Sequence, residues 1–279
     1  MESLVSTEWL EQALGAPDLR IVDSSWFLPG SGRDARAEYE AGHIPGAVFL
    51  DLDEVSDRDS PLPHMIPPTH IFASRMQSLG LGDGHRIVVY DDSPLHSAAR
   101  GWWMLKAFGA HYVAILDGGF QKWMAEGRSF EIGRDLHRHG HFMARLDPDD
   151  VADKAQVLAA IAGDQAIVDA RPAARFAGET PEPRLGLASG HMPGARSLPQ
   201  SKLFNPDHTY KSREALKAEF DRAGIDLAMP MITTCGSGVT AASVLFAAHL
   251  LGKQDVRVYD GSWSEWGADP ALPKVRGPA

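Results

Sequence analysis

Short apolar runs rich in β-branched residues recur along the chain and predict buried strands. The first half contains LRIVD (19–23) and RIVVYD (86–91), and the second half contains QAIVDA (165–170) and PMITTC (230–235). Continuous apolar runs of this length are typical of strands that are covered on both faces of a parallel sheet.

Segments with a helical pattern of apolar and polar positions separate these strands. The pattern predicts helices over residues 96–109, 213–224 and 241–252, and a glycine ends each of these segments. Alternation of strands with helices indicates an α/β fold with parallel sheets. Ligands of such sheets bind at the carboxyl ends of the strands, so we expect the functional residues to follow the strands directly.

Three short motifs occur twice in the same order, which indicates a duplicated domain. The pairs are GHIPGA (42–47) with GHMPGA (190–195), LDGGFQKW (116–123) with YDGSWSEW (259–266), and IVDSSW (21–26) with IVDARP (167–172). Their offsets are 148, 143 and 146 residues. We therefore predict two tandem α/β domains, each a mainly parallel sheet flanked by helices, over residues 1–135 and 148–279, with a polar linker over residues 136–147.

Composition narrows the class of protein. The net charge of −10 over 279 residues argues against nucleic acid or an anionic membrane as the main partner. No apolar run approaches the ~18 residues that a membrane helix needs. A single cysteine excludes an internal disulfide and a site with several cysteine ligands for a metal, so we expect a soluble protein of a reducing compartment, the cytoplasm.

The only cysteine, Cys235, lies at the carboxyl end of a predicted strand and begins the loop CGSGVT (235–240). Gly236 and Gly238 can adopt positive φ, which would turn successive N–H groups toward one point, and the following helix adds its positive end. This arrangement would stabilise a thiolate and then a bound anion. We therefore predict a nucleophilic cysteine, although a buried structural cysteine is the commoner fate of a lone thiol.

Other chemistries of a strand–loop–helix segment do not match this loop. A nucleotide-binding P-loop requires a lysine, and the nucleophile elbow of hydrolases requires a different order of glycine and serine. A cysteine phosphatase would place an arginine six residues after the cysteine, where this chain has Ala241.

The two GH(I/M)PGA motifs, the two DG(G/S)xxxW motifs and the cysteine loop together resemble the rhodanese family of sulfurtransferases with two tandem domains. Within that family CGSGVTA is similar to the loop of 3-mercaptopyruvate sulfurtransferases, whereas thiosulfate-using members have an arginine and a lysine after the cysteine. The resemblance implies that Cys235 accepts a sulfur atom as a persulfide and passes it to a thiol such as thioredoxin or a small thiol, or to cyanide. It implies no cofactor.

The resemblance also implies the residues around the thiol. Arg175 and Arg184 match the two substrate-binding arginines of the family, and a planar guanidinium suits a carboxylate. We expect the loop residues to contact the substrate as well; these are Gly236, Gly238, Val239 and Thr240. Arg171 is the third arginine of the segment, and a structural role is the alternative for it.

Release of pyruvate requires a path for protons, because the C–S bond breaks to leave an enolate. Ser237 is the hydroxyl within the loop, and Asp53 and His64 match the proposed Asp–His–Ser relay of the family. The first half of the chain has Asp91 at the position of Cys235, and a carboxylate cannot carry sulfane sulfur. The first domain is therefore expected to be inactive as a transferase and to supply Asp53 and His64 to the site of the second domain.

Two readings compete with a mercaptopyruvate enzyme. One is a thiosulfate sulfurtransferase, which is disfavoured because Gly236 and Ser237 carry no charge for a dianion. The other is a non-catalytic sulfur carrier or scaffold. A metal site formed by the alternating His137, His139 and His141 is also disfavoured, because neither carboxylates nor cysteines complete a ligand set there.

Overall fold

The computed structural model describes residues 1–134, 138–163 and 165–278. Contacts between Cα atoms divide the chain into two compact units. The first consists of residues 1–58, 66–147 and 205–210, and the second of residues 59–65, 148–204 and 211–279. Two short segments therefore pack with the unit formed mainly by the other half of the chain. The predicted domain boundaries at 135 and 136 lie outside the described residues.

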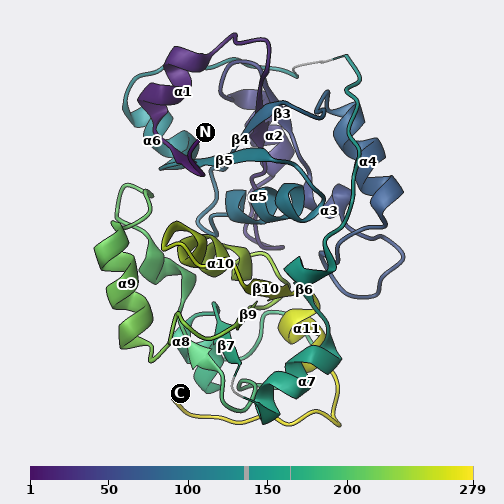
Figure 1. Ribbon diagram of the computed structural model, residues 1–279, viewed down its shortest axis with the longest axis vertical. Coiled ribbons are helices and arrows are strands. Elements are labelled where there is room, and N and C mark those ends of the chain that lie inside the picture. The colour runs from purple at the N-terminus through teal and green to yellow at the C-terminus, as the bar shows by residue number, and fades with distance from the viewer. Residues whose placement is uncertain (135–137, 164, 279) are drawn as a thin grey trace. The chain divides into compact units, whose positions relative to one another are not determined.

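The first unit is a five-stranded parallel sheet with helices (Figure 1). Its strands are β1 (Leu4–Val5), β2 (Leu19–Asp23), β3 (Ala47–Phe49), β4 (Arg86–Tyr90) and β5 (Tyr112–Leu116). Its helices are α1 (Thr7–Ala13), α2 (Ala35–Ala41), α3 (Leu52–Val55), α4 (Thr69–Ser78), α5 (Ala98–Ala107) and α6 (Gly119–Ala125). The strand order is β1-β5-β4-β2-β3, and each neighbouring pair is parallel.

The second unit repeats this topology, with the strand order β6-β10-β9-β7-β8 and parallel pairs throughout. Its strands are β6 (Val151–Ala152), β7 (Ala166–Asp169), β8 (Arg196–Ser197), β9 (Met231–Thr234) and β10 (Val256–Tyr259). Its helices are η1 (Pro148–Asp150), α7 (Lys154–Ala162), α8 (Ala173–Ala177), η2 (Gln200–Leu203), α9 (Arg213–Arg222), α10 (Ala241–Leu250) and α11 (Ser262–Trp266). The predicted α/β class and the duplication are confirmed.

Each sheet is the centre of its own core. The apolar strand residues that motivated the prediction are buried on β4 and on β9, where Val88 and Met231 have no exposed surface. Five tryptophans are core residues and are each at most 3 % exposed: Trp102, Trp103, Trp123, Trp263 and Trp266. Burying rings of this size contributes strongly to the stability of each unit.

The histidines of the two GH(I/M)PGA motifs, His43 and His191, have a structural role. The Nδ1 atom of each bonds a backbone carbonyl, that of Tyr39 at 2.8 Å and that of Phe176 at 2.9 Å. Each imidazole also stacks on the ring of the same residue, with ring centroids 4.2 and 3.7 Å apart. Both rings are therefore fixed by local packing.

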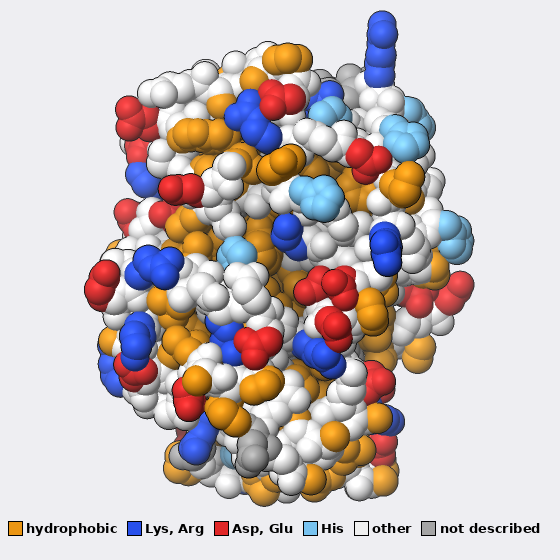
Figure 2. All heavy atoms as spheres, viewed as in Figure 1, with side chains coloured by type: hydrophobic (Ala, Val, Ile, Leu, Met, Phe, Trp, Pro, Cys, Tyr) orange, Lys and Arg blue, Asp and Glu red, His pale blue; other side chains and the backbone are white. Residues whose placement is uncertain are grey.

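Charges of both signs lie on the surface. Figure 2 shows one face, on which Lys and Arg side chains are interspersed with Asp and Glu side chains. Every helix among the described residues is too short or too polar to span a bilayer. The described residues also contain no group of three His, Cys, Asp or Glu side chains that could hold a metal ion. His137 lies outside them, whereas His139 and His141 are exposed, and His141 pairs with Asp83.

Candidate active site

Cys235 lies where the sequence predicts, directly after β9 and before the loop that leads into α10. Its side chain is 2 % exposed. Its backbone is fixed by α11: the carbonyl accepts a hydrogen bond from the N–H of Trp263 at 3.0 Å, and the N–H donates to Ser262 Oγ at 3.2 Å. The thiol is therefore buried on a loop whose backbone is anchored.

The two glycines of the cysteine loop differ in backbone conformation. Gly238 adopts φ 80°, the left-handed conformation that was expected. The same expectation was wrong for Gly236, which does not have a positive φ. A Cβ at Gly236 would lie 3.2 Å from Arg175 Nη2, which is a tight contact, and 3.8 Å from Arg184 Nη1, which is an ordinary van der Waals distance. The loop ends at the buried Val239 and at Thr240, which precedes the first turn of α10.

Arg175 and Arg184 are thus both brought to the cysteine loop. Arg175 projects from the short helix α8, and Arg184 lies in the segment that follows it. Two guanidiniums beside the residue next to the thiol provide a fixed positive environment for a small carboxylate. The two side chains that were predicted to bind substrate converge on one point.

Ser237 and His64 are also brought together. The Nδ1 atom of His64 and the Oγ atom of Ser237 are joined by a hydrogen bond of 2.9 Å. Both residues are buried, at 5 % exposure each. His64 belongs to the first half of the sequence, yet it packs in the segment 59–65 of the second unit. Its backbone has φ 61°, a left-handed conformation that only a minority of non-glycine residues adopt.

Asp53, the third member of the predicted relay, lies on α3 in the first unit. Its Oδ2 atom accepts a hydrogen bond from Trp26 Nε1 at 3.0 Å, and its side chain is exposed. Nothing in the geometry of the second unit tests its place in a relay with His64, which stays a prediction.

Arg171 has the structural role that was left open for it. Its side chain is 1 % exposed, donates from Nε and Nη2 to Asp169, and donates from Nη2 to the Gly190 carbonyl at 2.8 Å. The guanidinium also lies 4.2 Å from the centre of the Trp263 ring. These contacts fix Arg171 within the core beneath the loop.

In the first unit, the loop that corresponds to the cysteine loop begins at Asp91, and the Asp91 carboxylate bonds the N–H groups of that loop. Asp91 accepts hydrogen bonds from the N–H groups of Ser93 at 2.8 Å and Ala98 at 2.7 Å, the latter at the start of α5. Burial raises the pKa of Asp91 to about 7, against the opposing effect of these two bonds. A carboxylate thus fills the position that an anionic ligand would need.

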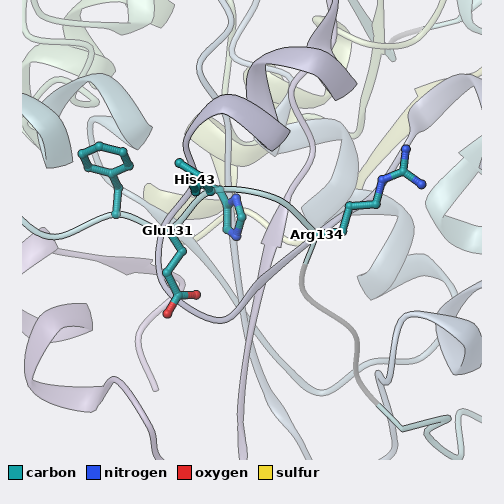
Figure 3. Close-up of a pocket in the computed structure, with 5 residues that line it drawn as sticks. His43, Glu131 and Arg134 are labelled. Carbon is teal, nitrogen blue, oxygen red and sulfur yellow. The ribbon is translucent and has the colours of Figure 1, made fainter.

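A cavity of about 580 Å³ in the first unit is a weaker candidate site. It is lined by His43, Phe130, Glu131, Ile132 and Arg134, three of which are labelled in Figure 3. The imidazole of His43 is already fixed by Tyr39, and the Glu131 carboxylate accepts from the N–H of Gly46. Arg134, the third charged or titratable residue of the lining, donates from Nε to Glu40 at 2.6 Å, so these three side chains already have structural partners.

Sequence reasoning missed three residues of the second unit that support the site. They are Asp169 and Glu182, which bind the arginines, and Ser262, which bonds the cysteine backbone. Asp169 and Ser262 lie within the repeated motifs, and Glu182 lies between the two predicted substrate arginines. The repeat itself was the signal for Asp169 and Ser262, whereas no pattern in the sequence distinguishes Glu182 from an exposed glutamate.

Comparison with known proteins identifies the family of the chain. The rhodanese-like domain family matches residues 6–126 and 153–269. Among curated proteins, the chain is 44% identical to a 3-mercaptopyruvate sulfurtransferase of Mus musculus, over 95% of this chain and 91% of that protein. It is 41% identical to a thiosulfate sulfurtransferase of Cricetulus griseus, over 95% and 91%.

Among solved structures, the chain resembles that of SseA from Escherichia coli, a 3-mercaptopyruvate sulfotransferase by its description. The TM-score is 0.87 and the identity 40%, over 94% of this chain and 99% of that one. Both the sequence match and the structural match cover nearly the whole chain. The chain belongs to the rhodanese family of sulfurtransferases with two tandem domains.

Proposed function

We propose that the protein is a 3-mercaptopyruvate sulfurtransferase with Cys235 as the sulfur carrier. The observation that carries the proposal is the convergence of Arg175 and Arg184 on Gly236, directly beside the thiol. Mercaptopyruvate has one carboxylate next to a carbonyl, which a pair of guanidiniums can hold by charge-assisted hydrogen bonds. The similarity to mercaptopyruvate enzymes supports the same donor.

The first half-reaction forms the persulfide. The Cys235 thiolate attacks the sulfur of mercaptopyruvate, an S–S bond forms, and the C–S bond breaks with its electron pair going to carbon. The product is the enolate of pyruvate, which takes a proton to become pyruvate. The donor thiol loses a proton, and the bonded pair of Ser237 and His64 is placed to move protons in this step. Asp53 would assist His64.

In the second half-reaction a thiolate acceptor attacks the outer sulfur of the persulfide and leaves Cys235 as a thiolate. The acceptor is a thiol such as thioredoxin or a small thiol. Gly236, Gly238, Val239 and Thr240 would contact the transferred group with their backbone. A reducing compartment, the cytoplasm, suits an enzyme whose carrier must return to the thiolate state.

Thiosulfate is the second candidate donor, because a thiosulfate sulfurtransferase is nearly as similar to this chain. The direct test measures pyruvate released from mercaptopyruvate, and sulfite released from thiosulfate, each with the same thiol acceptor. Pyruvate release with a much higher kcat/KM supports the proposal. Sulfite release as the dominant activity, or neither product, would overturn it.

A further inference from the structure

Glu182 is a buried carboxylate shared between two arginines of the second unit. Its side chain is 1 % exposed. Its Oε1 atom accepts from Arg171 Nη1 at 2.8 Å, and its Oε2 atom accepts from Arg175 Nη2 at 2.5 Å. Arg175 Nε also donates to Oε1, at 3.3 Å. The carboxylate therefore holds the guanidinium fork of Arg175 from behind.

This contact determines where Arg175 points. The same Nη2 atom that donates to Glu182 lies 3.2 Å from the position of a Cβ on Gly236. The Arg175 side chain retains 19 % of its surface exposed, whereas the Arg171 and Glu182 side chains retain 1 % each. Arg175 is thus the paired arginine that keeps accessible surface for a ligand, and Glu182 fixes its direction.

The charges of this cluster nearly balance. We define the arginine cluster as Arg171, Arg175, Arg184, Asp169 and Glu182. Three guanidiniums against two carboxylates leave a single positive charge, and the Asp169, Arg171 and Glu182 side chains are buried, where charges interact more strongly than in water. One net positive charge complements a donor with one negative charge.

We infer that Glu182 is a positioning residue that also sets donor specificity, by aiming Arg175 and by limiting the net charge of the arginine cluster to one. The inference rests on the proposed function. With Glu182 ionised, a monoanion such as mercaptopyruvate is matched, whereas a dianion such as thiosulfate leaves one charge uncompensated. Loss of the Glu182 charge adds a positive charge next to the loop and favours the dianion.

The experiment compares three variants of the full chain. Glu182→Gln removes the charge and keeps the shape, and Glu182→Asp keeps the charge with a shorter side chain. Glu179→Gln is the matched control, because Glu179 is an exposed glutamate three residues earlier in the same segment. The kcat and KM of each are measured with mercaptopyruvate and with thiosulfate, using one thiol acceptor.

The expected result is a rise of about 10-fold or more in the ratio of thiosulfate to mercaptopyruvate kcat/KM for Glu182→Gln, mostly through KM. Glu182→Asp and Glu179→Gln should keep the wild-type ratio. An equal loss of kcat/KM with both donors in Glu182→Gln would overturn the inference. It would also be overturned if Glu182→Asp or Glu179→Gln changed the donor ratio as much as Glu182→Gln does.

A loss of stability in Glu182→Gln does not obscure this result, because both donors are measured on one preparation and the ratio is independent of the folded fraction. The wild-type protein separates the two proposals. Absence of pyruvate release by the wild type would contradict the proposed function itself. A wild type that releases pyruvate, with an unchanged ratio in Glu182→Gln, contradicts only the role of Glu182.

Discussion

His64 Nδ1 and Ser237 Oγ lie 2.9 Å apart, although 173 residues separate the two in the sequence. A buried hydrogen bond between an imidazole and a hydroxyl is a unit that can accept and deliver protons. Ser237 follows Cys235 by two residues, so this hydrogen-bonded pair would serve as the proton path of the proposed reaction.

Replacement of His64 by asparagine should lower kcat for mercaptopyruvate by about 10²-fold or more and change KM much less, because the imidazole acts on protons rather than on donor binding. Asparagine tolerates the left-handed backbone of this position better than alanine, so folding is preserved. The measurement is the rate of pyruvate release over about pH 6 to 9. A wild-type kcat over that whole range would make His64 a structural residue.

Truncation of Arg175 or Arg184 to alanine should reduce the half-reaction with the donor and spare the half-reaction with the acceptor. Each variant loses a charge-assisted contact, which costs on the order of 2–4 kcal/mol in kcat/KM for mercaptopyruvate. Single-turnover rates of persulfide formation and of persulfide consumption check this separately. Equal slowing of both half-reactions would place the arginines in acceptor binding or in folding.

The first unit should stay inactive even when it is given a thiol. In Asp91→Cys, tested in a Cys235→Ser background, the new cysteine replaces a carboxylate that accepts two N–H groups. It does not acquire the arginine pair that lies beside Cys235. Incubation with mercaptopyruvate should leave the intact mass unchanged, and a stoichiometric gain of one sulfur atom would show that this loop is competent.

Asp23 should make stability depend on pH in a direction opposite to that of a salt-bridged carboxylate. Burial raises its pKa to about 6, and the Ser25 N–H bond opposes this effect only in part. The folded state therefore holds more protons than the unfolded state between about pH 4 and pH 6, and stability falls as pH rises through this window.

Asp23→Asn cannot ionise, so its stability relative to the wild type should increase from about pH 4 to pH 7, by up to about 3 kcal/mol. Asparagine can still accept the hydrogen bond from the Ser25 N–H through its amide oxygen. Denaturant unfolding of both proteins at the two pH values checks the difference. A difference that is the same at both pH values would show that Asp23 keeps its ordinary pKa.

The parts of the fold that sequence could predict are those that depend on local pattern. Apolar runs and helical periodicity identified the strands β2, β4, β7 and β9 and the helices α5, α9 and α10, and the doubled motifs predicted two similar units. The position of Cys235 followed from the same pattern, because the carboxyl end of a parallel strand is where such loops lie.

The parts that could not be predicted depend on tertiary packing. The segment around His64 packs with the unit formed by the other half of the chain, and no local signal indicates such an exchange. Gly236 was expected to have a positive φ, but it does not, and the guanidiniums of Arg175 and Arg184 lie close to the place where a side chain would begin. Glu182 was missed because a buried carboxylate between arginines cannot be distinguished in sequence from an exposed one.

The two units differ in the partners of the aspartate at the end of an equivalent strand. Asp23 and Asp169 occupy equivalent positions at the ends of β2 and β7. Asp169 is paired with the buried Arg171, whereas the equivalent neighbour of Asp23 is Ser25, which carries no charge. The second unit has a charged network beneath its loop, whereas the buried carboxylate of Asp23 in the first unit is bonded by the uncharged Ser25 and Tyr90.

The central claim is that a single thiol carries the sulfur. The most direct measurement is the intact mass of the protein after incubation with mercaptopyruvate, followed by addition of a thiol acceptor. The wild type should gain the mass of one sulfur atom and lose it to the acceptor, while Cys235→Ser gains nothing and still folds. Sulfur uptake by Cys235→Ser, or pyruvate release by it at a substantial fraction of the wild-type rate, would contradict the account.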